Sequence, residues 1–142
     1  MRQKTYSSER PEKLYRIENI QNSYCTVVFI DNITTLTDEE GNTYYEYDSY
    51  VHDGVLYRKN LDALIGTEFN IWLNEAKQYD YDKAAAEIRK QRDALLNDTD
   101  WTQMPDSALS QEKQERYRIY RQALRDVPEQ EGFPYDVIFP TF

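Results

Sequence analysis

Near its C-terminal end the sequence reads Asp100-Trp101-Thr102-Gln103-Met104-Pro105-Asp106-Ser107, between two segments of helical periodicity. Pro105 cannot continue a helix, and Asp106 and Ser107 favour turn conformations. Asp100 can accept hydrogen bonds from the backbone N–H groups that follow it. The stretch is therefore predicted to reverse the chain and to join two helices into a helical hairpin.

Trp101 is the large aromatic side chain of this polar stretch. A ring of that size is rarely left wholly exposed, because folding it back removes much apolar area from water. We expect Trp101 to plug the open end of the hairpin. The alternative is a ring that stacks on a ligand.

Two helices are predicted to flank this connector. The first covers about 82–96 and carries a weak stripe with a charged opposite side. The second begins after Ser110, a good N-cap, with Glu112 favourable in its first turn. The two stripes consist of Ala85, Ile88, Arg92 and Leu95, and of Tyr117, Tyr120, Leu124 and Val127.

Four arginines spread around the second helix, at positions 116, 118, 121 and 125. At most Arg118, Arg121 and Arg125 can form one basic strip. Acidic residues lie throughout the neighbouring sequence, so local ion pairing is the favoured interpretation of these side chains.

The connector, both helices and the end of the chain together resemble the C-terminal domain of phage tail assembly chaperone proteins, over roughly residues 83–140. The motif residues that carry the resemblance are Arg92, Asp100, Trp101, Pro105, Asp106, Tyr120, Arg121, Leu124, Arg125, Pro128, Phe133, Pro134 and Pro140. The resemblance implies a small protein encoded by a tailed phage or prophage and associated with making tails or tail fibres.

The chain ends in an apolar, proline-punctuated stretch, residues 132–142, after Pro128 has stopped the second helix. Such a tail must be covered. Because the resemblance extends through it, we expect it to pack back across the hairpin. The alternative is insertion into another chain as an added strand or apolar plug.

Composition limits the classes of partner. The 142 residues include 26 acidic and 17 basic side chains, for a net charge of −9. Phosphate would be repelled, so nucleic acid and anionic membranes are disfavoured as partners. Acidity for solubility alone is the simpler account, and a basic protein partner stays open. The 13 tyrosines suit both a core and a protein contact surface.

The sequence favours a soluble protein of a reducing compartment. Cys25 is the single cysteine, and no long apolar run or signal peptide is apparent. For a phage or prophage protein, the expected location is the bacterial host cytoplasm. Incorporation into the virion and self-association are left open.

The predicted fold class is α+β, in three parts. Residues 1–13 are polar and are expected to be a flexible N-terminal arm. Residues 14–79 are expected to form a small antiparallel β-meander packed by a helix, and residues 80–142 the hairpin and its tail. The meander is built on a strand at Tyr24–Ile30, with turns at 31–32, 37–42 and 52–54. The packing helix begins near Leu61, after Asn60 as a cap, and ends near Gln78.

A tyrosine-rich strand at residues 43–51 is the main candidate for a contact surface. Its alternation places Tyr45, Tyr47 and Ser49 on one face, opposite Tyr44 and Tyr50. The candidate partner-binding residues are Tyr44, Tyr45, Tyr47, Tyr50, Trp101 and Phe133.

Catalysis is poorly supported by the sequence. His52, the only histidine, precedes Asp53-Gly54 in an expected turn, and Cys25 lies in an apolar run where thiols are usually inert. No metal-ligand spacing or phosphate-binding glycine loop is present, so no enzyme, metal or cofactor is predicted.

The sequence thus predicts a non-enzymatic assembly factor that binds an unassembled phage tail or tail-fibre protein and shields its apolar surface. The alternative is a structural tail or fibre subunit retained in the virion. An acidic mimic of DNA is a third candidate, disfavoured because lysine and arginine interrupt the negative charge.

Overall fold

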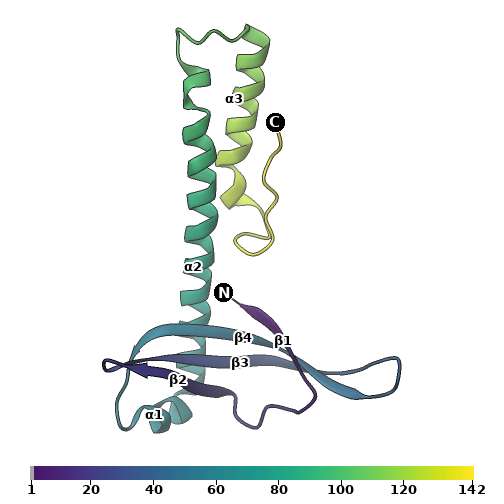
Figure 1. Cartoon of the computed structure of the whole chain (residues 1–142), viewed down its shortest axis with the longest axis vertical. Helices are drawn as coiled ribbons and strands as arrows, with labels where there is room; N and C mark the ends of the chain where they lie inside the picture. Colours follow the sequence, from purple (N-terminus) through teal and green to yellow (C-terminus); the bar gives the residue numbers. More distant parts are fainter. Residues whose placement is uncertain (1) are drawn as a thin grey trace. The chain divides into compact units, whose positions relative to one another are not determined.

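The structure is a computed structural model that describes residues 2–142. It contains two compact units, one up to Tyr81 and the other Asp82–Phe142. A four-stranded antiparallel sheet precedes the helices, so the predicted α+β class is confirmed (Figure 1).

The sheet has the order β1-β4-β3-β2, and every neighbouring pair is antiparallel. Its strands are β1 (Gln3–Ser7), β2 (Tyr15–Gln21), β3 (Tyr24–Thr37) and β4 (Thr43–Leu56). β2, β3 and β4 follow one another as the predicted meander. β3 and β4 are much longer than the two edge strands.

The predicted flexible arm is wrong over Gln3–Ser7, which forms edge strand β1 against β4. Its side chains are polar, and cross-strand partners rather than apolar burial hold them. The Lys4 Nζ donates to Glu46 at 2.5 Å, and the hydroxyls of Thr5 and Ser49 lie 3.1 Å apart. Such pairs stabilise a strand only once its neighbour exists, so the isolated segment carries little sign of them.

Two of the predicted turns are β-bulges within continuous strands. Asn32 has φ 54° and Gly54 has φ 73°, and each lies where the pairing of β3 with β4 shifts register. A bulge accommodates an extra residue and bends the strand without ending it. The turn predicted at 37–42 is present, and Gly41 takes a positive φ of 84° there.

The core of the N-terminal unit lies between the sheet and the helices α1 (Leu61–Thr67) and α2 (Phe69–Asp98). The predicted single helix from Leu61 is interrupted at Glu68, whose φ of −115° is not helical. The interruption lets both segments turn an apolar side to the same core. That core comprises Cys25, Val27, Phe29, Tyr50, Val55, Leu61, Ile65, Leu73 and Ala76.

The C-terminal unit contains the later part of α2, η1 (Asp100–Gln103), α3 (Gln111–Arg125), η2 (Val127–Glu129) and the tail. α2 runs unbroken through residues 79–82, where one helix was predicted to end and another to begin. Ser110 caps α3 as predicted, because its hydroxyl accepts a hydrogen bond from the Lys113 N–H. Leu124 and Val127 are fully buried.

Candidate functional site

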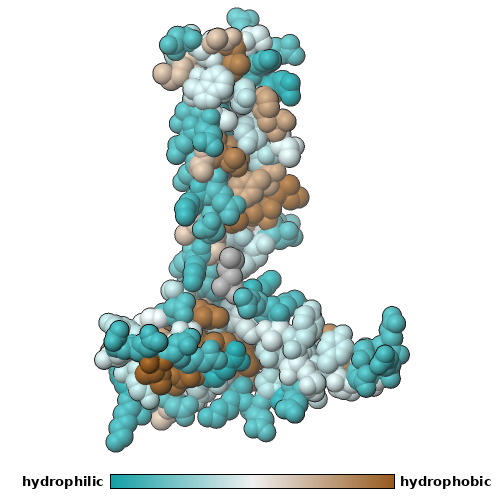
Figure 2. Space-filling model, viewed as in Figure 1, coloured by the Kyte–Doolittle hydropathy of each residue, from teal (hydrophilic) through white to brown (hydrophobic). Residues whose placement is uncertain are grey.

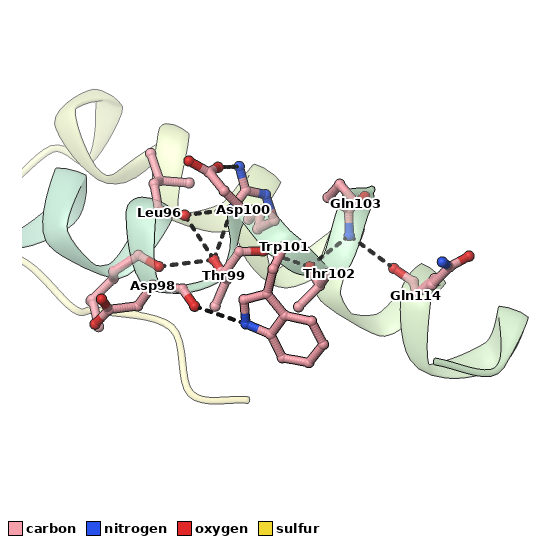
Figure 3. Close-up of polar contacts among 10 residues, drawn as sticks. Leu96, Asp98, Thr99, Asp100, Trp101, Thr102, Gln103 and Gln114 are labelled. Carbon is pink, nitrogen blue, oxygen red and sulfur yellow. Dashed lines mark hydrogen bonds and ion pairs between the residues drawn. The ribbon is translucent and has the colours of Figure 1, made fainter. Parts of the chain in front are cut away.

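Two motif residues, Arg121 of α3 and Asp100 of η1, meet at the C-terminal end of α2. Figure 3 shows Leu96, Thr99 and Asp100 at this point. The Arg121 Nη1 donates to the Leu96 carbonyl at 2.6 Å and to the Thr99 hydroxyl at 2.8 Å. Its Nη2 donates to the Asp100 carboxylate at 2.5 Å. The Arg121 side chain is 8% exposed and that of Asp100 62%. We call Leu96, Thr99, Asp100 and Arg121 the arginine node.

The arginine node satisfies backbone carbonyls that a helix end leaves without partners. The Thr99 hydroxyl donates to the Leu95 and Leu96 carbonyls at 2.8 and 3.1 Å, and Arg121 adds a cation where the helix dipole is negative. One arginine therefore joins α3, the end of α2 and the start of η1. The Arg121 and Asp100 motif positions have a structural reason to occur together.

Trp101 does not plug the connector. Its side chain is 53% exposed, its indole N–H donates to the Asp98 carbonyl at 3.1 Å, and its ring lies 6.2 Å from that of Tyr117. The buried position belongs to Thr102, which is 0% exposed and donates to the Thr99 carbonyl at 2.6 Å. A tight helical turn buries the smaller side chain, which can satisfy its own hydroxyl. Trp101 is left facing outward at the surface.

The other motif residues are distributed over α2, the connector, α3 and the tail. Leu124 is in the interior, and the Phe133 ring lies 5.2 Å from the Arg89 guanidinium. Pro134 is buried, and Pro128 is in η2. Pro105, Asp106 and Arg125 are exposed, Tyr120 and Pro140 are half-buried, and Arg92 pairs with Asp93.

Two of the four arginines of α3 form the local ion pairs that the sequence favoured. Arg118 pairs with Glu115 at 2.6 Å, and Arg121 pairs with Asp100. Arg121 is also buried, so the continuous strip of Arg118, Arg121 and Arg125 does not form at the surface.

The C-terminal tail contacts α3 through aromatic rings. Phe142 stacks on Tyr117 at 4.1 Å, meets Tyr120 edge-on at 5.8 Å and lies 4.9 Å from the Arg116 guanidinium. Earlier in the tail, the Gln130 side-chain amide both donates to and accepts from the Ile138 backbone, at 2.8 Å each. A hollow of about 250 Å³ remains between tail and helix, lined by Arg116, Ile119, Tyr120, Ala123, Pro140, Thr141 and Phe142.

Three exposed apolar side chains lie on α3 and the tail, and two of them, Ile119 and Phe142, line this hollow. Ile119 is 59% exposed, Ile138 78% and Phe142 55%. Figure 2 shows apolar side chains gathered along the flank of the C-terminal unit. We call these three residues the tail-side patch. Ile119 lies off the predicted helical stripe, so sequence reasoning missed it, whereas Ile138 and Phe142 belong to the tail that was predicted to be apolar.

The tyrosines of β4 alternate between the two faces of the sheet, as the sequence predicted. Tyr44 contacts Tyr6 of β1, and Tyr50 packs in the core beside the helices. Tyr45 and Tyr47 lie on the other side, where they line an open hollow of about 840 Å³. Tyr47 and Tyr50 are 7% and 6% exposed, so little of either ring is accessible.

His52 and Cys25, for which the sequence offers little support for catalysis, both lie in the N-terminal unit. His52 lies against Tyr79, with ring centroids 4.8 Å apart, and its Nδ1 is buried. Burial lowers the pKa of His52, while Glu75 and Asp53 act in the opposite direction. Burial raises the pKa of the Cys25 thiol, which disfavours the reactive thiolate.

Over residues 2–142, no three His, Cys, Asp or Glu side chains are grouped so that they could hold a metal ion. Within the same residues, none of the helices has the combined length and apolarity that a bilayer crossing requires.

Comparison with known families finds a match in the C-terminal segment. Residues 85–141 match the model of the family described as phage tail assembly chaperone protein. The resemblance predicted from the motif residues is thereby confirmed. The matched segment contains the arginine node, α3 and the tail. Neither a curated protein nor a solved structure matches the chain.

Proposed function

We propose that this protein is a non-enzymatic assembly chaperone of a tailed phage or prophage. It binds an unassembled tail or tail-fibre protein in the bacterial host cytoplasm and shields the apolar surface of that client. The family match over residues 85–141 is the observation that carries the proposal. We take the two helices and their proline-ended tail as the functional unit of this chaperone.

The tail-side patch supplies a surface suited to such a role. Exposed aliphatic and aromatic side chains beside a shallow hollow can cover an apolar region of a client and then release it. Arg116 lies within the same surface, and a long arginine stem adds apolar contact while its head stays hydrated. The N-terminal sheet then provides contacts specific to one client, for which Tyr44 and Tyr45 remain accessible in part.

Capture from phage-producing host cells tests the chaperone function. The tagged chain is recovered from the lysate, and mass spectrometry is applied both to the captured proteins and to purified particles. A tail protein in the lysate complex, with this chain absent from particles, is the expected result. Stoichiometric presence in particles would favour the structural subunit instead.

Substitutions in the tail-side patch test where the client binds. Ile119→Ser and Ile138→Ser each remove an exposed apolar side chain, so we expect client binding to weaken by about fivefold to tenfold per substitution. Ile71→Ser is the matched control, because Ile71 is 58% exposed but lies in the N-terminal unit. Equal binding by all three variants would remove the patch from the mechanism.

A further inference from the structure

The outer half of β3 lies at an open edge of the sheet. β2 pairs with β3 only from Tyr24 to Phe29, and the Ile30 N–H donates to the Leu14 carbonyl just beyond. From Thr34 to Thr37, β3 pairs with β4 on one side. Among residues 2–142, no strand pairs with the other side of this segment.

The turn at the end of β3 fixes which backbone groups face outward. The Asp38 N–H donates to the Asn42 carbonyl, and the Gly41 N–H donates to the Asp38 carbonyl, both at 3.1 Å. Asp38 and Asn42 therefore form a hydrogen-bonded pair. Such pairs alternate with non-bonded pairs along an antiparallel ladder. Thr35 and Thr37 consequently direct their N–H and carbonyl groups away from β4, toward the open edge.

The open edge lacks the usual protection against pairing. Its sequence is Asn32-Ile33-Thr34-Thr35-Leu36-Thr37, with no charge, no proline and four β-branched residues. Natural sheets commonly protect edges with lysine, proline or a covering segment. The bulge at Asn32 lies at the inner end of the segment, so it leaves Thr35 and Thr37 in regular pairing.

The turn beside the open edge carries negative charge, which bears on what can pair with that edge. The turn that follows contains Asp38, Glu39 and Glu40, all exposed. A second copy of this chain would bring no cation to the turn with its own edge, because residues 30–43 contain no lysine or arginine. Lys77 already pairs with Asp31 and offers that turn no cation. Self-pairing is therefore disfavoured.

We propose that the open edge of β3 at Thr35 and Thr37 binds an extended segment of the client, which adds a strand to the sheet. The segment has uncharged, β-branched residues at its centre and a lysine or arginine where it meets the acidic turn. Main-chain hydrogen bonds supply attachment, and the charge at one end supplies selection. The identity of the occupant as a client rests on the proposed chaperone function.

Asp38 keeps the turn acidic and well ordered. Its carboxylate accepts hydrogen bonds from the Asn42 side chain at 3.0 Å and from the Asn42 N–H at 2.8 Å, and these lower the pKa of Asp38. The Asp38 carboxylate therefore stays ionised through neutral pH and is held at a fixed place beside the edge.

A defined peptide tests the edge directly. The probe is a fluorescein-labelled peptide of alternating threonine and valine with one terminal lysine, added to the full-length chain and followed by fluorescence anisotropy. We expect binding that the Thr35→Pro variant weakens by about tenfold, because proline removes an outward N–H without breaking a bond to β4. Thr35→Val keeps that N–H and serves as the matched control.

Three outcomes would overturn the proposal. These are no binding by wild-type protein up to about 1 mM peptide, equal binding by Thr35→Pro and Thr35→Val, and a wild-type dimer that Thr35→Pro abolishes. Circular dichroism establishes that each variant is folded. Hydrogen exchange supplies a second readout that needs no variant: bound peptide should slow exchange of the Thr35 and Thr37 amides, and unchanged exchange would count against edge pairing.

The acidic turn is tested by reversing its charge. The double variant Glu39→Lys and Glu40→Lys changes two exposed side chains and leaves the Asp38 hydrogen bonds in place. We expect it to bind the lysine-ended peptide about threefold to fivefold more weakly, and to prefer a glutamate-ended peptide. An unchanged preference would overturn the charge selection. Capture of an intact tail protein decides the chaperone function separately, so either proposal can fail alone.

Discussion

At the residue scale, Arg121 links α3 to the end of α2 and the start of η1. Its buried guanidinium donates hydrogen bonds to the Leu96 carbonyl, the Thr99 hydroxyl and the Asp100 carboxylate. Lysine cannot reproduce this arrangement, because an ammonium lacks the planar fork that reaches several acceptors at once. The pairing could be anticipated from the sequence only as general ion pairing, since the partner atoms include a backbone carbonyl of α2.

We predict that Arg121→Met lowers the free energy of unfolding of the C-terminal unit by about 2–3 kcal/mol, because the partly buried Leu96 carbonyl and Thr99 hydroxyl lose a charged donor. Asp100→Asn should cost about 0.5 kcal/mol, since Asp100 is largely exposed. Arg118→Met, in an exposed pair, is the control and should leave the free energy of unfolding nearly unchanged. Urea denaturation measures all three, and equal effects would contradict the ranking.

His52 makes the stability of the N-terminal unit depend on pH. Burial lowers its pKa in the folded state below the ordinary value of 6.5, although Glu75 and Asp53 oppose the shift. The folded state therefore binds fewer protons than the unfolded state in this range. Stability should be complete above pH 6.5 and should fall as the pH drops from there toward the folded-state pKa.

We predict that the midpoint urea concentration of the N-terminal unit decreases when the pH is lowered from 7.5 to 5.5. His52→Gln should remove part of this decrease. Asp31 and Asp38 titrate below their ordinary value, so their contribution appears at lower pH. An identical pH profile for His52→Gln would show that another group is responsible.

At the element scale, the strands show what sequence reasoning can and cannot reach. Periodicity and β-branched content predicted the Tyr24–Ile30 strand and the helix-then-connector order near the C-terminus. They missed β1, whose polar side chains are held only by cross-strand partners. They also divided β3 and β4 at Asn32 and Gly54, because local turn preference cannot distinguish a bulge from a reversal.

The connector shows the same limit. Size alone favoured burial of Trp101, yet η1 buries Thr102 and turns the indole outward. Which side of a short helical turn faces inward depends on the packing of α3, which no local pattern contains. The presence of the connector and of the Ser110 cap could be predicted, because both depend on residues next to one another in sequence.

Replacing either of two glycines by alanine should change stability, with opposite signs in the turn and in the helix. Gly41 has φ 84° and no atom within 4 Å of an added Cβ, so Gly41→Ala should cost about 1–2 kcal/mol through backbone strain alone. Gly66 lies within α1, and its added Cβ would meet only the Tyr15 hydroxyl at 3.5 Å. Gly66→Ala should therefore stabilise by about 0.5–1 kcal/mol. Thermal denaturation measures both, and shifts of the same sign would contradict the assignment.

At the scale of the whole molecule, α2 contributes residues to both compact units. The described contacts of the arginine node and the tail lie within Asp82–Phe142, and the sheet core lies before Tyr81. The sequence predicted a β-meander with its packing helix, followed by a hairpin that resembles the chaperone family. The family match covers only the second of these.

We predict that a fragment of residues 82–142 retains helical structure and unfolds cooperatively, because the arginine node, the Ser110 cap and the buried Leu124 are all inside it. Far-ultraviolet circular dichroism with thermal melting measures this. Arg121→Met in the same fragment is the control and should lower its melting temperature. A fragment that melts without a transition would show that the unit needs the preceding residues.

The positions of the two tryptophans give each unit its own optical signal. Trp72 packs against the sheet core, whereas Trp101 stands half exposed beside the arginine node. Their emission maxima should differ, with Trp101 further to the red, because indole emission follows the polarity of its surroundings. In Trp72→Phe and Trp101→Phe variants, intrinsic fluorescence would report one unit at a time, so the order in which the units unfold or engage a client could be followed without an attached dye.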